Sequence, residues 1–322
     1  MRILITGAAG FIGSNLAERL IAGNELIGID NFDSFYPRAV KEGSLLSLKN
    51  EPGFTLIEAD IRDAGAMERI FAEARPDVVI HLAAKAGVRP SIEDPAGYAE
   101  VNINGTISLL EAARKAGVKD ILFASSSSVY GNTKEVPFSE AAFVDRPISP
   151  YAATKKAGEL FCNTYAHLHG LKIASLRFFT VYGRRQRPDL AIAKFTRMID
   201  QGDEIPFFGD GSTERDYTYI DDILDGIEGA MGWTVKQKAG THEVFNLGEG
   251  RTTTLSAMVA AIEEALGKKA KIKRLPMQPG DVLRTYADVS KAHKAFGYDP
   301  STLLVDGVKE YVHWYRETGA RV

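Results

Sequence analysis

The chain of 322 residues is long for one domain, but α/β enzymes of this length commonly fold as one unit with two lobes. Hydrophobic residues make up 45% and charged residues 25%, a balance typical of a soluble protein with a substantial core, which argues against disorder. The formal charge of −3 offers no basic surface for a phosphate backbone, which argues against a nucleic-acid partner.

Two features of the sequence bear on the compartment. Cys162 is the single cysteine, so no disulfide can form within the chain, which favours a reducing cytoplasm. The first strand pattern begins at Ile3 without an apolar leader, and no apolar run approaches the roughly 20 residues that a membrane helix needs. We therefore expect a cytoplasmic protein with no membrane partner.

Short apolar runs alternate with helical patterns through the first half of the chain. Several runs are continuously apolar, which is typical of parallel strands covered by helices on both faces. The pattern therefore predicts an α/β fold with a Rossmann-like doubly wound parallel sheet. Strands are expected at residues 3–6, 25–30, 55–58, 78–81, 121–125 and 173–178.

The alternation ends after residue 178, where Gly, Pro, Arg and Asp become frequent. We therefore expect a first domain at residues 1–179 and a smaller mixed α/β lobe at residues 180–322. Strand patterns at 217–222 and 244–247 predict that the chain returns to the first domain near residues 217–225 and 243–248. Helices in the smaller lobe are expected at residues 191–201, 255–266 and 304–318.

A glycine-rich segment follows the first predicted strand and opens a helical pattern. Gly7, Gly10 and Gly13 have the spacing G-x-x-G-x-x-G, with Phe11 and Ile12 at the start of the helix. Glycines allow a pyrophosphate to approach backbone amides, and the helix N-terminus adds partial positive charge. The segment therefore predicts a dinucleotide site, although an ordinary glycine-rich turn would have the same residues.

Asp30 ends the second predicted strand, 17 positions after Gly13. An acidic residue at about this distance meets the adenosine ribose, and its charge repels a 2′-phosphate. The first domain is therefore predicted to bind NAD in preference to NADP. The structural alternative is that Asp30 caps the loop of residues 31–34.

A second motif places three reactive side chains at the same end of the predicted sheet. Tyr151 and Lys155 are one helical turn apart and can act as a pair. Ser126 ends a predicted parallel strand, where open α/β sheets hold their ligands. A nearby ammonium and an oxidised nicotinamide favour the phenolate of a tyrosine, so Tyr151 is the expected base, tuned by Lys155, with Ser126 on the reacting hydroxyl.

In this order the motifs resemble those of the extended short-chain dehydrogenase/reductases, specifically the nucleotide-sugar 4-epimerases, from Met1 to about Tyr315. The resemblance is carried by residues 6–13, 60–62, 81–84, 102–106, 125–131 and 151–155. It implies roles in binding the cofactor for Asn31, Asp60, Ile61, Leu82, Ala83, Ala84, Asn102 and Phe178. Among these, Asp60 and Ile61 would flank the adenine, Ala83 and Asn102 would line the cofactor channel, and Phe178 would lie beside the nicotinamide.

The resemblance also implies the reaction. Tyr151 would take the C4-hydroxyl proton while a hydride passes to NAD⁺, and hydride return to the opposite face of the 4-keto sugar would invert C4. Relatives that dehydrate or decarboxylate this intermediate carry an acidic residue in the segment matching residues 126–128. Here Ser127 and Ser128 carry only hydroxyls, so an NAD-dependent epimerase is expected.

The expected substrate is a UDP-hexose. Residues 177–189 are similar to the UDP-glucuronate 4-epimerases, whereas UDP-glucose epimerases usually carry Asn where Thr180 stands. Ser127, Ser128 and Thr180 can offer hydroxyls to a C6 carboxylate, which favours conversion of UDP-glucuronate to UDP-galacturonate. A UDP-glucose/UDP-galactose 4-epimerase remains the alternative.

Three arginines and one aspartate complete the expected substrate site. Arg89, Arg187 and Arg215 are assigned to phosphates or acid groups, and the resemblance places Arg215 on the diphosphate and Asp281 on the uridine ribose. The alternative for the arginines after Gly183 is a solvated loop or a set of salt bridges between lobes, which we favour for Arg184.

Three further expectations concern partners and alternatives. The resemblance implies a homodimer through helices near residues 102–115 and 151–169. The six histidines lack metal-ligand spacing, so no metal is expected. A dinucleotide-sensing regulator without catalysis is a remote alternative, since such proteins typically lose the pair formed here by Tyr151 and Lys155.

Overall fold

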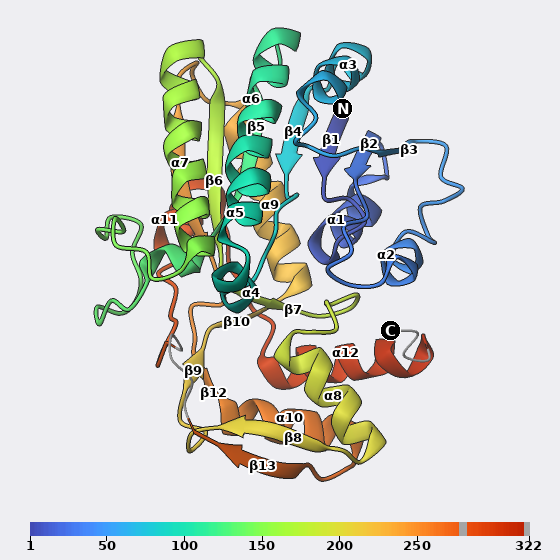
Figure 1. Ribbon diagram of the computed structural model, residues 1–322, viewed down its shortest axis with the longest axis vertical. Helices are drawn as coiled ribbons and strands as arrows, with labels where there is room; N and C mark the ends of the chain where they lie inside the picture. Colours follow the sequence, from blue (N-terminus) through green and yellow to red (C-terminus); the bar gives the residue numbers. More distant parts are fainter. Residues whose placement is uncertain (277–281, 319–322) are drawn as a thin grey trace.

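A seven-stranded sheet forms the larger lobe of the structure, a computed structural model that describes residues 1–276 and 282–318 (Figure 1). Its strand order is β11-β6-β5-β4-β1-β2-β3, and every neighbouring pair is parallel. The strands are β1 (Arg2–Thr6), β2 (Glu25–Asp30), β3 (Phe54–Glu58), β4 (Val78–His81), β5 (Asp120–Ser126), β6 (Lys172–Phe178) and β11 (His242–Leu247). The predicted doubly wound sheet is confirmed.

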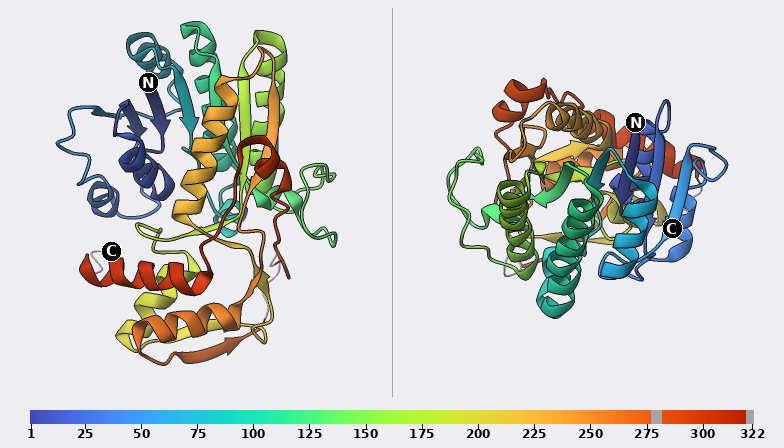
Figure 2. Two further views of the ribbon diagram at one scale, coloured as in Figure 1. Left: turned by 180° about the vertical axis from the view of Figure 1, so that it is seen from behind. Right: turned by 90° about the horizontal axis from the view of Figure 1, so that it is seen from above.

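Helices cover both faces of this sheet (Figure 2). On β1, Ile3 and Ile5 join one buried cluster with α1 and α9, while Leu4 joins a second cluster with α3, α6 and α7. This alternation buries the strand on both sides, which accounts for its continuous apolar run. The helices of this lobe are α1 (Phe11–Leu20), α2 (Arg38–Ser44), α3 (Ala64–Ala74), α4 (Val88–Glu93), α5 (Pro95–Ala99), α6 (Gly105–Ala116), α7 (Pro150–His169), α9 (Ile220–Val235) and α11 (Ser290–Phe296). A π-helical turn, η1 (Glu100–Asn104), and a 3₁₀ turn, η2 (Ser127–Tyr130), complete the list.

The smaller lobe lies below the carboxyl ends of the sheet strands in Figure 1. Its helices α8 and α10 have the bounds expected from the sequence, and α12 ends one residue earlier. A parallel pair, β8 with β13, was not expected. The elements are α8 (Ala191–Gln201), α10 (Leu255–Leu266), α12 (Leu304–Glu317), β8 (Glu204–Phe208), β9 (Glu214–Arg215), β12 (Thr253–Thr254) and β13 (Lys271–Leu275).

The strand predicted at residues 217–222 is partly wrong. Only β10 (Tyr217–Tyr219) is extended, and it pairs with β7 (Thr180–Tyr182) rather than with the main sheet. From Ile220 the chain is helical, because acidic side chains in the first turn suit a helix N-terminus and apolar residues recur at helical spacing. The chain thus returns to the main sheet through α9, and then through β11 beside β6, as expected near residue 243.

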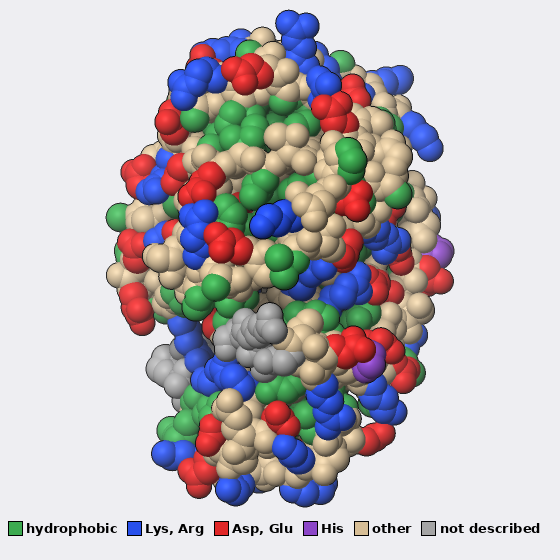
Figure 3. All heavy atoms as spheres, turned by 90° about the vertical axis from the view of Figure 1, so that its right-hand side faces the viewer, with side chains coloured by type: hydrophobic (Ala, Val, Ile, Leu, Met, Phe, Trp, Pro, Cys, Tyr) green, Lys and Arg blue, Asp and Glu red, His purple; other side chains and the backbone are tan. Residues whose placement is uncertain are grey.

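Charged side chains of both signs are interspersed over the surface. The face in Figure 3 shows Lys and Arg side chains alternating with Asp and Glu, without a large area of one sign. Within residues 1–276 and 282–318, no helix combines the length and the apolar character needed to cross a bilayer.

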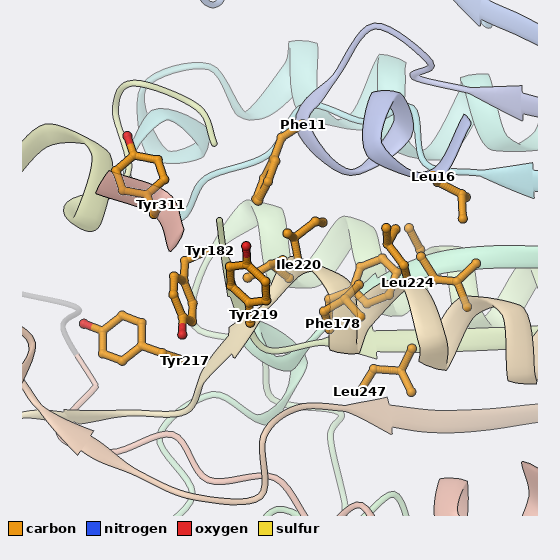
Figure 4. Packing of buried hydrophobic residues seen from close by; sticks show 14 of the residues in the cluster. Phe11, Leu16, Phe178, Tyr182, Tyr217, Tyr219, Ile220, Leu224, Leu247 and Tyr311 are labelled. Atoms are coloured by element: carbon orange, nitrogen blue, oxygen red, sulfur yellow. The ribbon is translucent and has the colours of Figure 1, made fainter. Parts of the chain in front are cut away.

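Tyrosines fill the junction between the two lobes. The ring of Tyr182, on β7, meets those of Tyr217 and Tyr219 edge-on, with centroids 6.4 Å and 5.5 Å apart (Figure 4). Gly307 of α12 packs directly on the same ring, since an added Cβ would lie 2.1 Å from Tyr182 Oη. The missing side chain therefore lets α12 of the smaller lobe reach the core of the junction.

One carboxylate ties together the segments that run between the lobes. Asp216 is fully buried, and its oxygens accept backbone N–H bonds from Glu249 (2.7 Å), Gly250 (3.1 Å) and Ala287 (3.0 Å). Its carbonyl also accepts the backbone N–H of Thr180 at 3.1 Å. Three segments that are remote in sequence, at Thr180, at Glu249 with Gly250 and at Ala287, therefore converge on this one residue.

Candidate active site

A pocket of about 530 Å³ lies at the carboxyl ends of the sheet strands and extends to the smaller lobe. Strand ends of the larger lobe supply Asp30, Ser126 and Phe178, whereas Arg215 and Thr285 come from the segments that lead to and from the smaller lobe. This is the position at which open α/β sheets bind ligands.

The glycine segment makes one wall of the pocket and has no room for side chains. Gly7 has a φ of +72°, and a Cβ on it would lie 2.9 Å from the backbone nitrogen of Ala83. A Cβ on Gly13 would lie 2.1 Å from the carbonyl oxygen of Gly7. Gly10 begins α1 without a side-chain cap, so the first-turn amides at Phe11 and Ile12 are left for another acceptor. The cradle fits a dinucleotide pyrophosphate.

Asp30 caps the following loop, which is the structural alternative weighed from the sequence, and it also lines the pocket. Its side chain lines the pocket, and its oxygens accept the backbone N–H groups of Ala9 (3.0 Å) and Phe32 (2.8 Å). The carboxylate therefore joins the glycine segment to the following loop while facing the pocket. Lys41, which the sequence analysis did not identify, is also buried in this wall, with Nζ 4.0 Å from Asp30 Oδ1.

The residues that the resemblance assigns to the adenine line one wall of the pocket. Asn31 Nδ2 donates to Asp60 Oδ2 at 3.0 Å, and Asp60 also pairs with Arg62 at 2.7 Å. The hydrogen bond from Arg62 lowers the pKa of Asp60 to about 2, so this carboxylate is ionised at neutral pH. Further along the same pocket lie Ile61, Leu82, Ala83 and Ala84.

Asn102 does not line the cofactor channel, which corrects the expectation from the sequence. It is 2% exposed and lies behind the wall, where its amide bonds both the backbone N–H (2.8 Å) and the carbonyl (2.9 Å) of Lys85. Its Nδ2 also donates to Thr154 at 3.0 Å. The π-helical turn η1 directs the side chain into the protein, so Asn102 shapes the wall that Lys85 presents to the pocket.

Ser126, Tyr151 and Lys155 come together in the pocket. Ser149 caps α7 by accepting the N–H of Ala152 at 3.1 Å, which starts the helix so that Tyr151 and Lys155 face the end of β5. Lys155 Nζ donates to the carbonyl of Ala124 at 2.7 Å and lies 6.0 Å from the centroid of the Tyr151 ring.

The electrostatics of the three residues differ from the expectation in one respect. Burial raises the pKa of Tyr151, while a hydrogen bond with Ser126 and the positive charge of Arg187 act to lower it. Burial lowers the pKa of Lys155 to about 8. The cation that acts on the phenol in this structure is therefore Arg187, whereas Lys155 is engaged with the strand carbonyl.

A row of hydroxyls lies beside these residues. Ser127 and Ser128, in η2, and Thr180, at the start of β7, all line the pocket. Ser128 Oγ is buried and has no hydrogen-bond partner among the described residues. Because a buried hydroxyl without a partner is costly, this oxygen fits a polar ligand group.

The predicted arginines have different environments. Arg187 lines the pocket, with its guanidinium paired to Asp189 (3.0 and 2.7 Å) and 4.9 Å from the ring centroid of Phe35. Arg215 also lines the pocket. Arg89 is not among the lining residues; it is exposed, with its guanidinium 5.5 Å from the ring centroid of Phe208. Asp281 lies outside the described residues.

The interlobe salt bridge favoured for Arg184 is present. Its guanidinium pairs with both oxygens of Asp221 at 2.9 Å, and the next residue, Arg185, pairs with Glu18 of α1 at 2.9 Å. Ion pairs therefore hold the segment of residues 183–190 against α9, through Asp221, and against α1, through Glu18.

Comparison with known proteins gives consistent similarities. The family model described as GDP-mannose 4,6 dehydratase matches residues 4–311. A UDP-glucuronate 4-epimerase of Thermodesulfobacterium geofontis is 42% identical over 98% of this chain and 96% of its own length.

Two solved structures have the same fold. The UDP-glucuronic acid 4-epimerase of Bacillus cereus, crystallised with UDP-glucuronic acid and NAD, superposes with a TM-score of 0.92 at 36% identity and covers 99% of this chain and 100% of its own. The UDP-glucose 4-epimerase of Thermotoga maritima, crystallised with UDP-glucose, gives a TM-score of 0.89 at 37% identity, with 99% of each chain covered.

Proposed function

We propose that the protein is an NAD-dependent UDP-sugar 4-epimerase that interconverts UDP-glucuronate and UDP-galacturonate. The chain belongs to the GDP-mannose 4,6-dehydratase family, and the proposal rests on this membership and on the geometry of the pocket. The family description names a dehydratase, but the η2 wall of this pocket contributes serines and no carboxylate. The observation that carries the proposal is the meeting of Ser126, Tyr151 and Lys155 with the unpartnered hydroxyl of Ser128 in one pocket.

We assign the cofactor to the cradle formed by the glycine segment and Asp30. When bound there, NAD supplies the acceptor and donor of a hydride at C4. The absence of Cβ atoms at Gly7 and Gly13 leaves room for the backbone amides to meet the pyrophosphate, and Asp30, which lines the same pocket, is assigned to the adenosine ribose. In this proposal the cofactor lobe consists of residues 1–179 with the returning segments near 217–225 and 243–248. The remaining residues from 180 onward hold the sugar nucleotide.

The chain's own residues then move one proton and hold the sugar. Tyr151 Oη takes the proton of the C4 hydroxyl and returns it after the 4-keto sugar has rotated to present its opposite face. Ser126 Oγ hydrogen-bonds the same oxygen. The guanidinium of Arg187 favours the phenolate, and Lys155 Nζ lies 6.0 Å from the centroid of the Tyr151 ring. We assign Arg215 to the diphosphate and Asp281 to the uridine ribose.

The C6 carboxylate is assigned to Ser127, Ser128 and Thr180. Three hydroxyl donors suit an anion, and the Ser128 hydroxyl lacks another partner within the described part of the chain. A UDP-glucose/UDP-galactose 4-epimerase is the second candidate, favoured by the similarity to the Thermotoga maritima enzyme.

The deciding experiment compares turnover of UDP-glucuronate and UDP-glucose by the purified protein, with the epimers separated and quantified. We expect the higher kcat/KM for UDP-glucuronate. Ser128→Ala should lower it about tenfold or more while leaving turnover of UDP-glucose nearly unchanged, because only the acid loses a hydrogen bond to a charged group. Faster turnover of UDP-glucose by the unaltered protein would refute the assignment of C6 but not that of the reaction.

We further propose a homodimer in the cytoplasm. Leu160 and Leu168 of α7 are 56% and 65% exposed and lie on one face of the helix, two turns apart, with the partly buried Phe161 and Tyr165 nearby. Such a row of exposed apolar side chains suits a helix-to-helix interface with a second copy. The single cysteine is a buried thiol, which is in keeping with a reducing compartment.

A further inference from the structure

A buried ion pair joins α7 to the main sheet just beyond the pocket. Glu159 accepts two hydrogen bonds from Arg177, from Nε at 2.8 Å and from Nη2 at 2.9 Å, and the two side chains are 3% and 2% exposed. Ser125 Oγ donates to Glu159 Oε1 at 2.6 Å. Arg177 Nη1 donates to Tyr130 Oη at 2.9 Å, and that hydroxyl donates in turn to Asn246 at 2.7 Å.

Three members of this network, Ser125, Glu159 and Arg177, are close in sequence to residues of the proposed active site. Ser125 precedes Ser126, Arg177 precedes Phe178, and Glu159 follows Lys155 by one helical turn. Ser125 and Arg177 are direct register partners, as are Ser126 and Phe178. Ser125 and Arg177 meet Glu159 under α7, and the next register pair, Ser126 and Phe178, lines the pocket, which Ser125 also borders.

The network therefore fixes the position of α7 relative to the strand ends. The planar guanidinium meets both carboxylate oxygens at once, which allows only one relative placement of helix and sheet. Charge pairs of this kind add little net stability compared with apolar residues of the same volume, because both ions lose their hydration. Its main contribution is then geometric rather than energetic.

We propose that Glu159 and Arg177 are positioning residues that hold Tyr151 and Lys155 of α7 in register with Ser126 of β5. This inference rests on the proposed epimerase function. Removal of the pair's charge complementarity lets the helix shift relative to the strands, and a shift of about 1 Å at reacting atoms can cost on the order of 100-fold in rate.

The same two strands provide a matched control at their opposite ends. Asp120 of β5 and Lys172 of β6 are register partners and form an ion pair at 2.6 Å, remote from the pocket at the amino ends of the strands. Both side chains are 15% exposed, so this pair also joins the strands in a largely buried setting. A loss of general stability should follow from breaking either pair, but only the pair beneath α7 should affect catalysis.

The test compares Glu159→Gln with Asp120→Asn, assayed well below their unfolding temperatures. For Glu159→Gln we expect kcat with UDP-glucuronate to fall about 100-fold with KM changed less than about threefold, and NAD still bound. For Asp120→Asn we expect kcat within about twofold of the unaltered protein. Glu159→Asp, which keeps the charge but is shorter, should lie between these two.

A second variant covers the case in which Glu159→Gln fails to fold. Glu159→Gln combined with Arg177→Met leaves no unpaired buried charge, so it should fold and still lack activity. Unchanged kcat in either folded variant, or an equal loss in Asp120→Asn, would overturn the positioning role. An unaltered protein that is inert with every UDP-hexose would instead refute the proposed function itself.

Discussion

The phenol of Tyr151 is the single group to which the proposed chemistry assigns the proton. Tyr151→Phe removes only that oxygen, so we expect kcat to fall about 10²- to 10⁴-fold, the range for a lost general acid–base group. NAD affinity, measured by titration, should change little because the ring and helix remain. Turnover by Tyr151→Phe close to that of the unaltered protein would exclude Tyr151 as the base. An unaltered protein with no activity would favour the alternative of a dinucleotide-sensing regulator.

The buried carboxyl group of Glu249 makes the free energy of unfolding depend on pH. Its side chain is 8% exposed, and neither carboxylate oxygen has a hydrogen-bond partner among the described residues. Burial, reinforced by the charge of Asp222, raises the pKa of Glu249 from 4.5 to about 8. Since the folded-state pKa exceeds the unfolded one, stability from this group is present below about pH 4.5 and is lost as the pH rises to about 8.

Glu249→Gln removes this dependence, because glutamine does not ionise. The variant should therefore gain in free energy of unfolding over the unaltered protein as the pH increases from about 5 to about 8. Denaturant unfolding at the two pH values measures the gap. A gap that stays constant or narrows with increasing pH would contradict the assigned pKa.

At the residue scale, side chains within local motifs could be anticipated from the sequence, and side chains oriented by tertiary structure could not. Gly7 follows β1, Gly13 is in the first turn of the next helix and Asp30 ends β2, so their place in the pocket follows from the fold. Asn102 has the family's position but faces away from the pocket because of the π-helical turn. Lys41 reaches the pocket from α2 across a loop whose course no local pattern specifies.

At the element scale, the close approach of α1 to the end of β1 depends on the lack of a Cβ atom at Gly7 and Gly13. Gly13→Ala would place a Cβ 2.1 Å from the Gly7 carbonyl, and backbone cannot give way without moving the helix. We expect a loss of about 1–3 kcal/mol in stability and a marked loss of NAD binding. Calorimetry and NAD titration would measure both.

Gly232 of α9 provides the matched control, because a Cβ there meets nothing within 4 Å. Gly232→Ala should increase the free energy of unfolding by about 0.5–1 kcal/mol through the lower entropy of the unfolded chain, with NAD binding unchanged. Equal behaviour of the two alanine variants would show that the glycine motif is not under steric constraint.

Elements with a strong periodic pattern were anticipated almost to the residue, and short ones were not. Strands β1, β2, β4, β5 and β6 of the main sheet are almost entirely buried, which gives them continuous apolar runs. Helices α8 and α10 repeat apolar residues at helical spacing. Strand β13 is largely exposed and β7 has three residues, so neither leaves a hydrophobic pattern. Strand β13 pairs with β8 and β7 pairs with β10, both in parallel, so each pairing depends on a long crossover connection.

At the scale of the whole molecule, the proposed dimer rests on the exposed face of α7. The double variant Leu160→Glu with Leu168→Glu would bury charge in that interface. We therefore expect the Kd of the dimer to rise at least about tenfold. Light scattering over a dilution series measures the mass. Leu46→Glu, at a side chain 67% exposed on the other side of the sheet, should leave the assembly unchanged.

The convergence of three chain segments on Asp216 bears on how the sugar inverts. The backbone amides of Thr180, Glu249, Gly250 and Ala287 all bond this one residue, which restrains the connections between the two lobes. We therefore expect the ketone to expose its opposite face through rotation of the sugar nucleotide within the pocket rather than through a hinge between the lobes.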